Sequence, residues 1–194
     1  MSLLFVNACM RPQSRTLRLA RMWLDRHQDD VRQTTVEEVN VAQVNIAPLD
    51  PGRLATYNAA VSRATYDDPL FDYAKQFAAA DEVLIACPFW NFSVPAKLHD
   101  YLELVCSQGV TFDVDKDGSY VSLCHAKRLT FICTAGGAIG DESNDHAFGY
   151  VRTLAQVFWH VPRIYNITVE SLDAPGANVE LLLRHALKST DRAR

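Results

Sequence analysis

The chain has no apolar run long enough to cross a membrane. A transmembrane helix needs about 20 consecutive, mainly apolar residues, and no segment of this sequence approaches that length. The N-terminal stretch MSLLFVNACMRPQ also lacks the basic segment and the longer apolar segment of a secretory signal. We therefore expect a protein of the cytoplasm that does not work at a membrane.

An excess of charge of one sign is missing as well. Charged residues make up 22% of the chain and the net charge is −4 at pH 7, which is ordinary for a globular protein. Proteins that bind nucleic acids usually carry a basic patch or stripe. We therefore expect no nucleic-acid partner.

Paired cysteine motifs are also lacking. The five cysteines are odd in number and widely spaced, without a C-x-x-C pair, which indicates reduced thiols. An acidic stretch, Asp113, Asp115, Asp117 and Gly118, matches the first half of a calcium loop. Such a loop needs a bidentate acid at the position where Cys124 stands. We therefore expect neither disulfides nor a bound metal.

Apolar, strand-like segments alternate with amphipathic helical segments along the whole chain. The expected strands are residues 2–8, 35–41, 81–88, 127–137 and 163–170, and the expected helices are 14–28, 54–64, 68–80, 94–108, 147–160 and 178–190. This alternation predicts an α/β fold with a parallel sheet covered on both faces. Residues 109–123 interrupt the pattern and predict a hairpin excursion. The length predicts a single domain over 1–194.

The loop after the first predicted strand has the composition of an anion site. Ligands of open α/β sheets bind at the carboxyl ends of the strands. Here Arg11 is followed by Ser14, Arg15 and Thr16 at the start of a helix, where free N–H groups and the helix dipole favour an anion. The loop contains no Walker or dinucleotide-binding glycine motif. A plain helix N-cap is the alternative interpretation.

The loops after the third and fourth predicted strands suit a flat ligand. The third strand leads into an aromatic-rich run: Pro88, Phe89, Trp90, Asn91 and Phe92. Aromatic rings on a surface loop need something to cover them, and a core corner or a subunit contact would also do so. The fourth strand ends at Gly136 and Gly137, which let a planar ligand approach the backbone or simply make a tight turn. Together the three loops predict one phosphorylated planar cofactor.

The segments ACMRPQSRT, PFWNFSVPAKLHDYLELV, GVTF and TAGG, in this order and spacing, resemble the flavodoxin-like NAD(P)H quinone reductase and FMN-dependent azoreductase family. The resemblance extends to about residue 170. It implies a flavodoxin-like three-layer sandwich, a five-stranded parallel sheet of order 2-1-3-4-5 with helices on both faces, and FMN as cofactor. It also implies a homodimer with active sites at the interface and two-electron reduction of quinones, azo compounds or nitroaromatics.

The resemblance assigns cofactor contacts to all three loops. Those for the phosphate are Cys9, Ser14, Arg15 and Thr16; those for the flavin ring are Pro88, Phe89, Trp90, Asn91 and Phe92; and those near its pyrimidine side are Thr134, Ala135, Gly136 and Gly137. Cys9 stands where many members have a phosphate-binding serine, and Ala135 where some azoreductases carry arginine. Phe112, Tyr120 and His146 are weaker candidates for substrate contacts.

The resemblance also implies a ping-pong mechanism. Hydride passes from NADH or NADPH to the flavin, and a small aromatic electron acceptor then takes the place of the nicotinamide. Because the flavin carries the redox chemistry, no catalytic side chain is expected.

Other interpretations belong to different functional classes. A response-regulator receiver is excluded, because it needs acidic residues where this chain has Asn7-Ala8-Cys9 and Pro88-Phe89. An electron-carrier flavodoxin shares the cofactor, although such proteins are usually shorter and strongly acidic. A flavin-free, partner-binding member of the fold also remains open.

Overall fold

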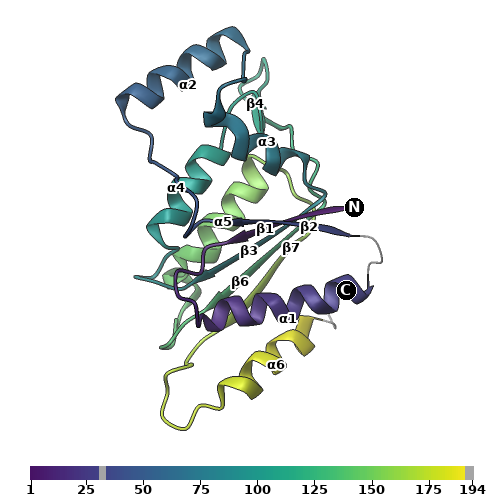
Figure 1. Cartoon of the computed structure of the whole chain (residues 1–194), viewed down its shortest axis with the longest axis vertical. Coiled ribbons are helices and arrows are strands. Elements are labelled where there is room, and N and C mark those ends of the chain that lie inside the picture. Colours follow the sequence, from purple (N-terminus) through teal and green to yellow (C-terminus); the bar gives the residue numbers. More distant parts are fainter. Residues whose placement is uncertain (31–33, 191–194) are drawn as a thin grey trace.

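The computed structural model describes residues 1–30 and 34–190 (Figure 1). Its centre is a five-stranded parallel sheet of order β2-β1-β3-β6-β7. These strands are β1 (Ser2–Asn7), β2 (Thr35–Asn40), β3 (Glu82–Pro88), β6 (Arg128–Thr134) and β7 (Ile164–Val169). Strands β4 (Phe112–Val114) and β5 (Tyr120–Ser122) form a separate antiparallel hairpin within the predicted excursion. Counted within the main sheet alone, the order is therefore 2-1-3-4-5, as predicted.

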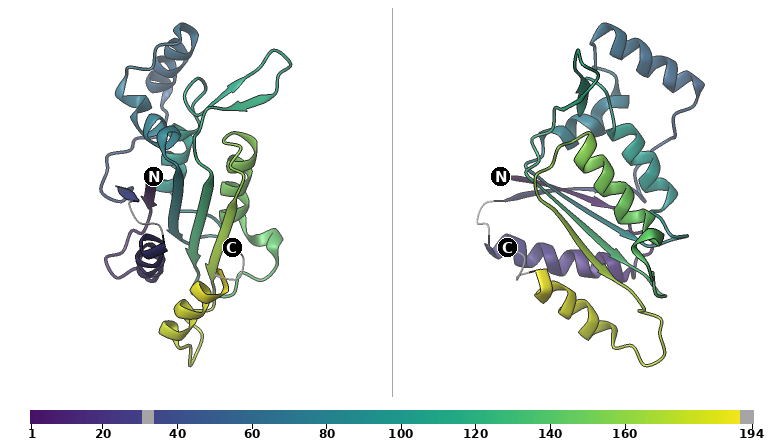
Figure 2. Two further views of the ribbon diagram at one scale, coloured as in Figure 1. Left: turned by 90° about the vertical axis from the view of Figure 1, so that its right-hand side faces the viewer. Right: turned by 180° about the vertical axis from the view of Figure 1, so that it is seen from behind.

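Helices cover both faces of the sheet. They are α1 (Arg15–Asp30), α2 (Pro51–Arg63), α3 (Asp72–Ala79), α4 (Ala96–Val105), α5 (His146–Val157) and α6 (Val179–Thr190), with short 3₁₀ turns η1 (Pro69–Phe71) and η2 (Glu142–Asn144). Figure 2 shows α1 and α6 on one side of the sheet and α3, α4 and α5 on the other. The expected three-layer sandwich is confirmed. No helix in the described ranges is long and apolar enough to span a bilayer.

The core lies in two layers, because successive side chains of a strand point to opposite faces. Leu4 and Val6 of β1 pack toward α3, α4 and α5, whereas Leu3 and Phe5 pack toward α1 and α6. Each such side chain contributes roughly 1.5–3 kcal/mol when it leaves water. Strand β3 is buried along nearly its whole length, since it lies between β1 and β6. The core thus fixes the carboxyl ends of these three strands side by side.

Helix α2 is the exception to this packing. It begins at Pro51, three residues before the predicted start, because the side chain of Asp50 caps it by accepting a hydrogen bond from the N–H of Arg53 at 2.9 Å. Among its residues only Ala60 is buried, and Leu54 is 45% exposed. Figure 1 shows α2 projecting at the end of the molecule that also carries the hairpin. The helix therefore leaves most of its surface uncovered in the single chain.

Candidate functional site

A cavity of about 670 Å³ opens at the carboxyl edge of the sheet. Four segments line it: residues 10–16 after β1, 88–90 after β3, 134–136 after β6 and 172–173 after β7. The three loops singled out in the sequence therefore meet in one place. The volume lies within the usual range for small-molecule sites.

Most of the predicted cofactor residues line this cavity. They are Ser14, Arg15, Thr16, Pro88, Phe89, Trp90, Thr134, Ala135 and Gly136. Four others are adjacent in sequence but do not form its wall: Cys9, Asn91, Phe92 and Gly137. The Cys9 side chain is buried, and its thiol donates to the carbonyl oxygen of Ala86 at 3.7 Å.

The start of α1 supplies the polar end of the cavity. The Ser14 hydroxyl accepts a hydrogen bond from the N–H of Leu17 at 3.2 Å, so Ser14 is the N-cap of the helix. The N–H groups of a helix's first turn have no acceptor inside the helix. The start of the helix therefore favours an anion. Ser14 can thus be both the N-cap of α1 and part of an anion site.

Thr16 joins this helix to the sheet. Its hydroxyl oxygen lies 2.7 Å from that of Thr134 at the end of β6, and both side chains are buried. The two hydroxyls therefore form a hydrogen bond with each other, and each can still form further hydrogen bonds. The pair connects the α1 wall of the cavity to the glycine loop.

The aromatic loop is a tight turn in a strained conformation. Trp90 and Ser93 exchange backbone hydrogen bonds of 3.0 and 2.9 Å, and the two residues between them have positive φ, 52° for Asn91 and 63° for Phe92. Turns of this kind favour glycine, and a bulky residue held there costs roughly 1–3 kcal/mol. The turn leaves Trp90 38% and Phe92 54% exposed. Strain and exposed rings together indicate a functional loop.

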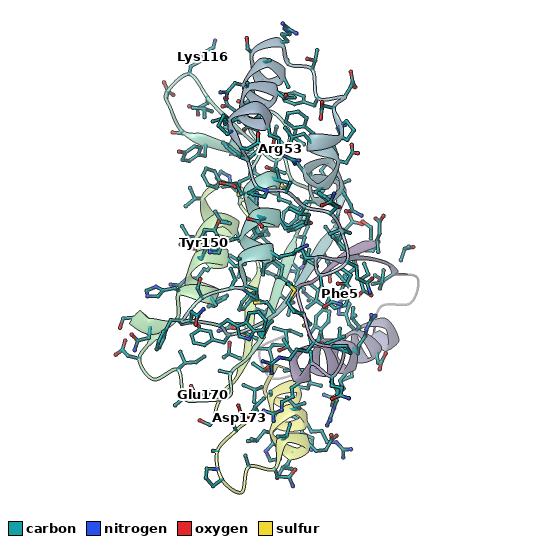
Figure 3. The ribbon with its side chains drawn as sticks, turned by 60° about the vertical axis from the view of Figure 1, so that its left-hand side comes forward. Phe5, Arg53, Lys116, Tyr150, Glu170 and Asp173 are labelled. Carbon is teal, nitrogen blue, oxygen red and sulfur yellow. The ribbon has the colours of Figure 1, made fainter. Side chains whose placement is uncertain are left out.

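The loop after β7 forms a wall that the sequence analysis missed. The N–H of Leu172 donates to the Ala135 carbonyl at 3.2 Å, and that of Asp173 donates to the Gly136 carbonyl at 2.9 Å. A Cβ on Gly136 would lie 2.1 Å from the Asp173 carboxylate, so glycine permits this close approach. Figure 3 shows Asp173 and Glu170 on this loop. Because β7 is parallel to β6, its carboxyl end necessarily reaches the same edge of the sheet.

Two arginines and one aspartate border the cavity. The Arg15 guanidinium forms an ion pair with Asp173, with 2.6 Å between Nη1 and Oδ1, and the two side chains are 41% and 67% exposed. The Arg11 guanidinium carbon lies 6.0 Å from the centroid of the Trp90 ring, a cation–π contact. Two positive charges thus lie near the start of α1, and one of them is held by a carboxylate.

Buried thiols lie directly before three of the cavity loops. Burial raises the pKa of the Cys9 thiol to about 11, although a hydrogen bond with Ser14 lowers it. Burial likewise raises the pKa of Cys87, which is paired in register with Cys133 on the neighbouring strand. Neutral thiols are poor nucleophiles. Cys9 and Cys87 therefore serve packing, and neither is a reactive thiolate at neutral pH.

The three weaker substrate candidates lie outside this cavity in the single chain. Phe112 and Tyr120 of the hairpin pack on Phe158, with ring centroids 4.5 and 4.7 Å from it. The N–H of His146 donates to the carbonyl of Phe92 at 3.1 Å, and His146 lines a separate cavity of about 400 Å³. Within the part of the chain that the structure describes, no cluster of three His, Cys, Asp or Glu side chains could hold a metal.

Comparisons with known proteins agree with this architecture. The profile of a family described as flavodoxin-like fold, Flavodoxin_2, matches residues 1–191. The FMN-dependent NADH:quinone oxidoreductase 2 of Clostridium acetobutylicum is 36% identical over 125 residues, which span 63% of this chain and only 62% of that protein. The FMN-dependent NADH:quinone oxidoreductase of Clostridium beijerinckii is 27% identical over 186 residues, 95% of this chain and 93% of that protein.

Solved structures show the same fold. An azoreductase from Bacillus anthracis superposes with a TM-score of 0.85 at 20% identity, over 100% of this chain and 98% of the other. At that identity the likeness concerns the fold alone, whereas the family profile covers nearly the whole sequence. The chain therefore belongs to the flavodoxin-like family whose profile matches residues 1–191.

Proposed function

We propose that this protein is an FMN-dependent oxidoreductase that transfers two electrons from NADH or NADPH to a quinone, an azo compound or a nitroaromatic compound. The observation that carries the proposal is the convergence of a helix start, an aromatic turn and a glycine loop on one cavity. The names of the two clostridial relatives, both FMN-dependent NADH:quinone oxidoreductases, support it.

The polar end of the cavity fits a phosphate. The α1 N-terminus offers N–H groups and the positive end of a dipole, and Arg11 and Arg15 add charge. Cys9 does not line the cavity, and its thiol interacts with Ala86 and Ser14. We propose that Ser14, Arg15, Thr16 and the helix N–H groups hold the phosphate. Cys9 would then act indirectly, through its hydrogen bond with the Ser14 side chain.

The remaining walls of the cavity fit a planar ring system. Phe89 and Trp90 supply apolar surface, and Ala135 and Gly136 leave the backbone open. The N–H of Phe89 donates to the carbonyl of Thr134 at 3.0 Å, which fixes the two loops to each other. The cavity therefore combines cationic and helix-start residues with apolar walls, the two features that FMN needs. We propose that Asn91, Phe92 and Gly137, which adjoin these walls, shape the loops that hold the ring.

The chain's own role in the reaction is to bind and to orient. When bound, FMN supplies the two-electron chemistry. The aromatic turn offers apolar surface to a flat acceptor, backbone hydrogen bonds fix the loops to one another, and the α1 dipole offsets the charge of the phosphate. NAD(P)H and the acceptor would use the same open side in turn, which gives ping-pong kinetics. We assign no catalytic acid or base.

We further propose that the protein works as a homodimer with Phe112 and Tyr120 near the partner's site. The hairpin exposes Val114, Tyr120 and Val121, and α2 exposes Leu54 at the same end of the molecule. Their charges are complementary: α2 carries only basic charges, whereas residues 113–117 of the hairpin carry three aspartates and one lysine. The five free cysteines suit the reducing cytoplasm.

The direct test is flavin binding followed by turnover. We expect purified protein to quench the fluorescence of added FMN at micromolar concentrations and to oxidise NADH or NADPH with menadione. Protein that binds no flavin at these concentrations would contradict the proposal. An electron carrier would bind FMN but would not oxidise NADH or NADPH directly. Measuring both FMN binding and NAD(P)H oxidation therefore distinguishes an oxidoreductase from an electron carrier.

A further inference from the structure

Asp173 brings a negative charge into the wall of a cavity that otherwise suits an anion. Its side chain lies at the same end as Ser14, Arg15 and Thr16, the start of α1. The Arg15 guanidinium, which could bind a phosphate, instead contacts the Asp173 carboxylate at 2.6 Å. One of the two cations that line this cavity is therefore already paired within the chain.

The backbone that carries Asp173 is fixed by its neighbours. The N–H of Asp173 bonds to the carbonyl of Gly136, and the N–H of Ser171 bonds to the carbonyl of Gly137 at 3.0 Å. The side chain rests against the Cα of Gly136, where a Cβ would overlap it. Glu170 also accepts a hydrogen bond of 2.6 Å from the N–H of Ile139. The loop after β7 is thus fixed to the glycine loop, which keeps Asp173 close to the start of α1.

The ion pair itself is weak enough to exchange. Exposed ion pairs contribute little to stability, because water and salt screen them. A phosphomonoester carries a charge of about −1.5 to −2 at pH 7, more than the single charge of a carboxylate. It would therefore attract Arg15 away from Asp173 and be repelled by the carboxylate that remains.

We propose that Asp173 is an affinity-limiting residue for phosphorylated flavin. It holds Arg15 in the flavin-free protein, and it repels the phosphate once flavin is bound. The ion pair therefore reduces the difference in binding affinity between FMN and riboflavin, which has the same ring system but lacks the phosphate. This inference rests on the proposed function, because it concerns the same cavity and the same ligand.

The test measures flavin affinity and needs no turnover. Flavin-free protein is titrated with FMN and with riboflavin, and quenching of flavin fluorescence gives the dissociation constant. We expect Asp173→Asn to tighten FMN binding by roughly two- to fivefold, the range of an exposed charge pair, and to leave riboflavin unchanged. The gain shrinks as salt is raised. Arg15→Gln weakens FMN alone, and Asp173→Asn gains less in that background.

A matched control separates the local contact from the overall charge. Glu180 of α6 forms exposed ion pairs with Arg18 of α1 and with Arg184 and does not line the cavity. Glu180→Gln therefore removes one carboxylate charge from an exposed ion pair with α1, as Asp173→Asn does. We expect it to leave FMN affinity unchanged. Thermal unfolding of each flavin-free variant checks that the fold is intact.

Each contrary outcome has a definite meaning. Weaker FMN binding by Asp173→Asn would mean that Asp173 orients Arg15 toward the phosphate, and unchanged binding would mean that the pair does not matter; both overturn the inference. An equal gain for Glu180→Gln, or for riboflavin, overturns it as well. A wild-type protein that binds neither flavin refutes the proposed function itself, whereas FMN binding without a difference between variants refutes only the role of Asp173.

Discussion

At the scale of single residues, the most informative contact is the one between the hydroxyls of Thr16 and Thr134. We predict that Thr16→Val lowers the free energy of unfolding by about 1–3 kcal/mol, because it leaves the buried Thr134 hydroxyl without this partner. Thr16→Ser keeps the hydroxyl and serves as the control. Urea unfolding of the flavin-free protein measures both. Equal stability of the two variants would show that the hydroxyl pair contributes nothing.

The sequence predicted the residues of the site where composition was unusual. Trp90 and Gly136 were predicted because aromatic residues and adjacent glycines at strand ends are uncommon and have a physical reason. Asp173 was not predicted, because a leucine and an aspartate after a strand look like any loop. Thr16 was predicted to bind phosphate, but its bond to Thr134 depends on the docking of α1, which no local pattern reveals.

At the scale of elements, the end of the sheet opposite the cavity contains a buried ionic contact. Glu82 at the start of β3 lies 2.8 Å from Nε2 of His27 on α1 and 3.7 Å from Nη1 of Arg128 on β6. Burial acts to raise the pKa of the Glu82 carboxyl, but His27, Arg128 and Arg163 together hold it below its usual value. Three elements are thus joined by one carboxylate.

This contact predicts a pH dependence of stability. Since the folded-state pKa of Glu82 lies below the unfolded value of about 4.3, its contribution is present above that pH and is lost as pH falls through the folded-state pKa. We predict that Glu82→Gln flattens the fall in urea midpoint between pH 5 and pH 3. Glu37→Gln, on the exposed side of β2, should leave the profile unchanged. Parallel profiles for Glu82→Gln and the wild type would contradict the assignment.

The alternation of segments was enough to predict the strands and a parallel sheet, because parallel strands need crossover helices. The order of the strands was implied only by the family resemblance. It could not predict that α2 stands away from the sheet. Hydrophobic periodicity marks which face of a helix is apolar, but it does not say what covers that face. The cap formed by Asp50 and Pro51 placed the true start of this helix, a signal that the apolar pattern alone did not use.

At the scale of the whole molecule, the uncovered helix and hairpin predict a dimer. We expect light scattering to give twice the 21.7 kDa chain mass. Leu54→Glu on α2 should shift the protein toward monomer, because it places a charge in the proposed apolar contact. Leu181→Glu on α6 is the matched control, since Leu54 and Leu181 are 45% and 47% exposed. A wild-type monomer, or equal effects of the two variants, would refute the proposed interface.

The four walls of the cavity are far apart in the chain, and the last of them, residues 172–173, comes close to the C-terminus. Chains emerge from the ribosome N-terminus first. The aromatic turn and the glycine loop can therefore be made well before the wall that closes the site. A ligand that needs all four walls can bind tightly only after β7 and the loop that follows it have been made. Binding of the cofactor would then occur only after β7 has been synthesised. A chain truncated before β7 would bind no cofactor and would remain sensitive to proteolysis.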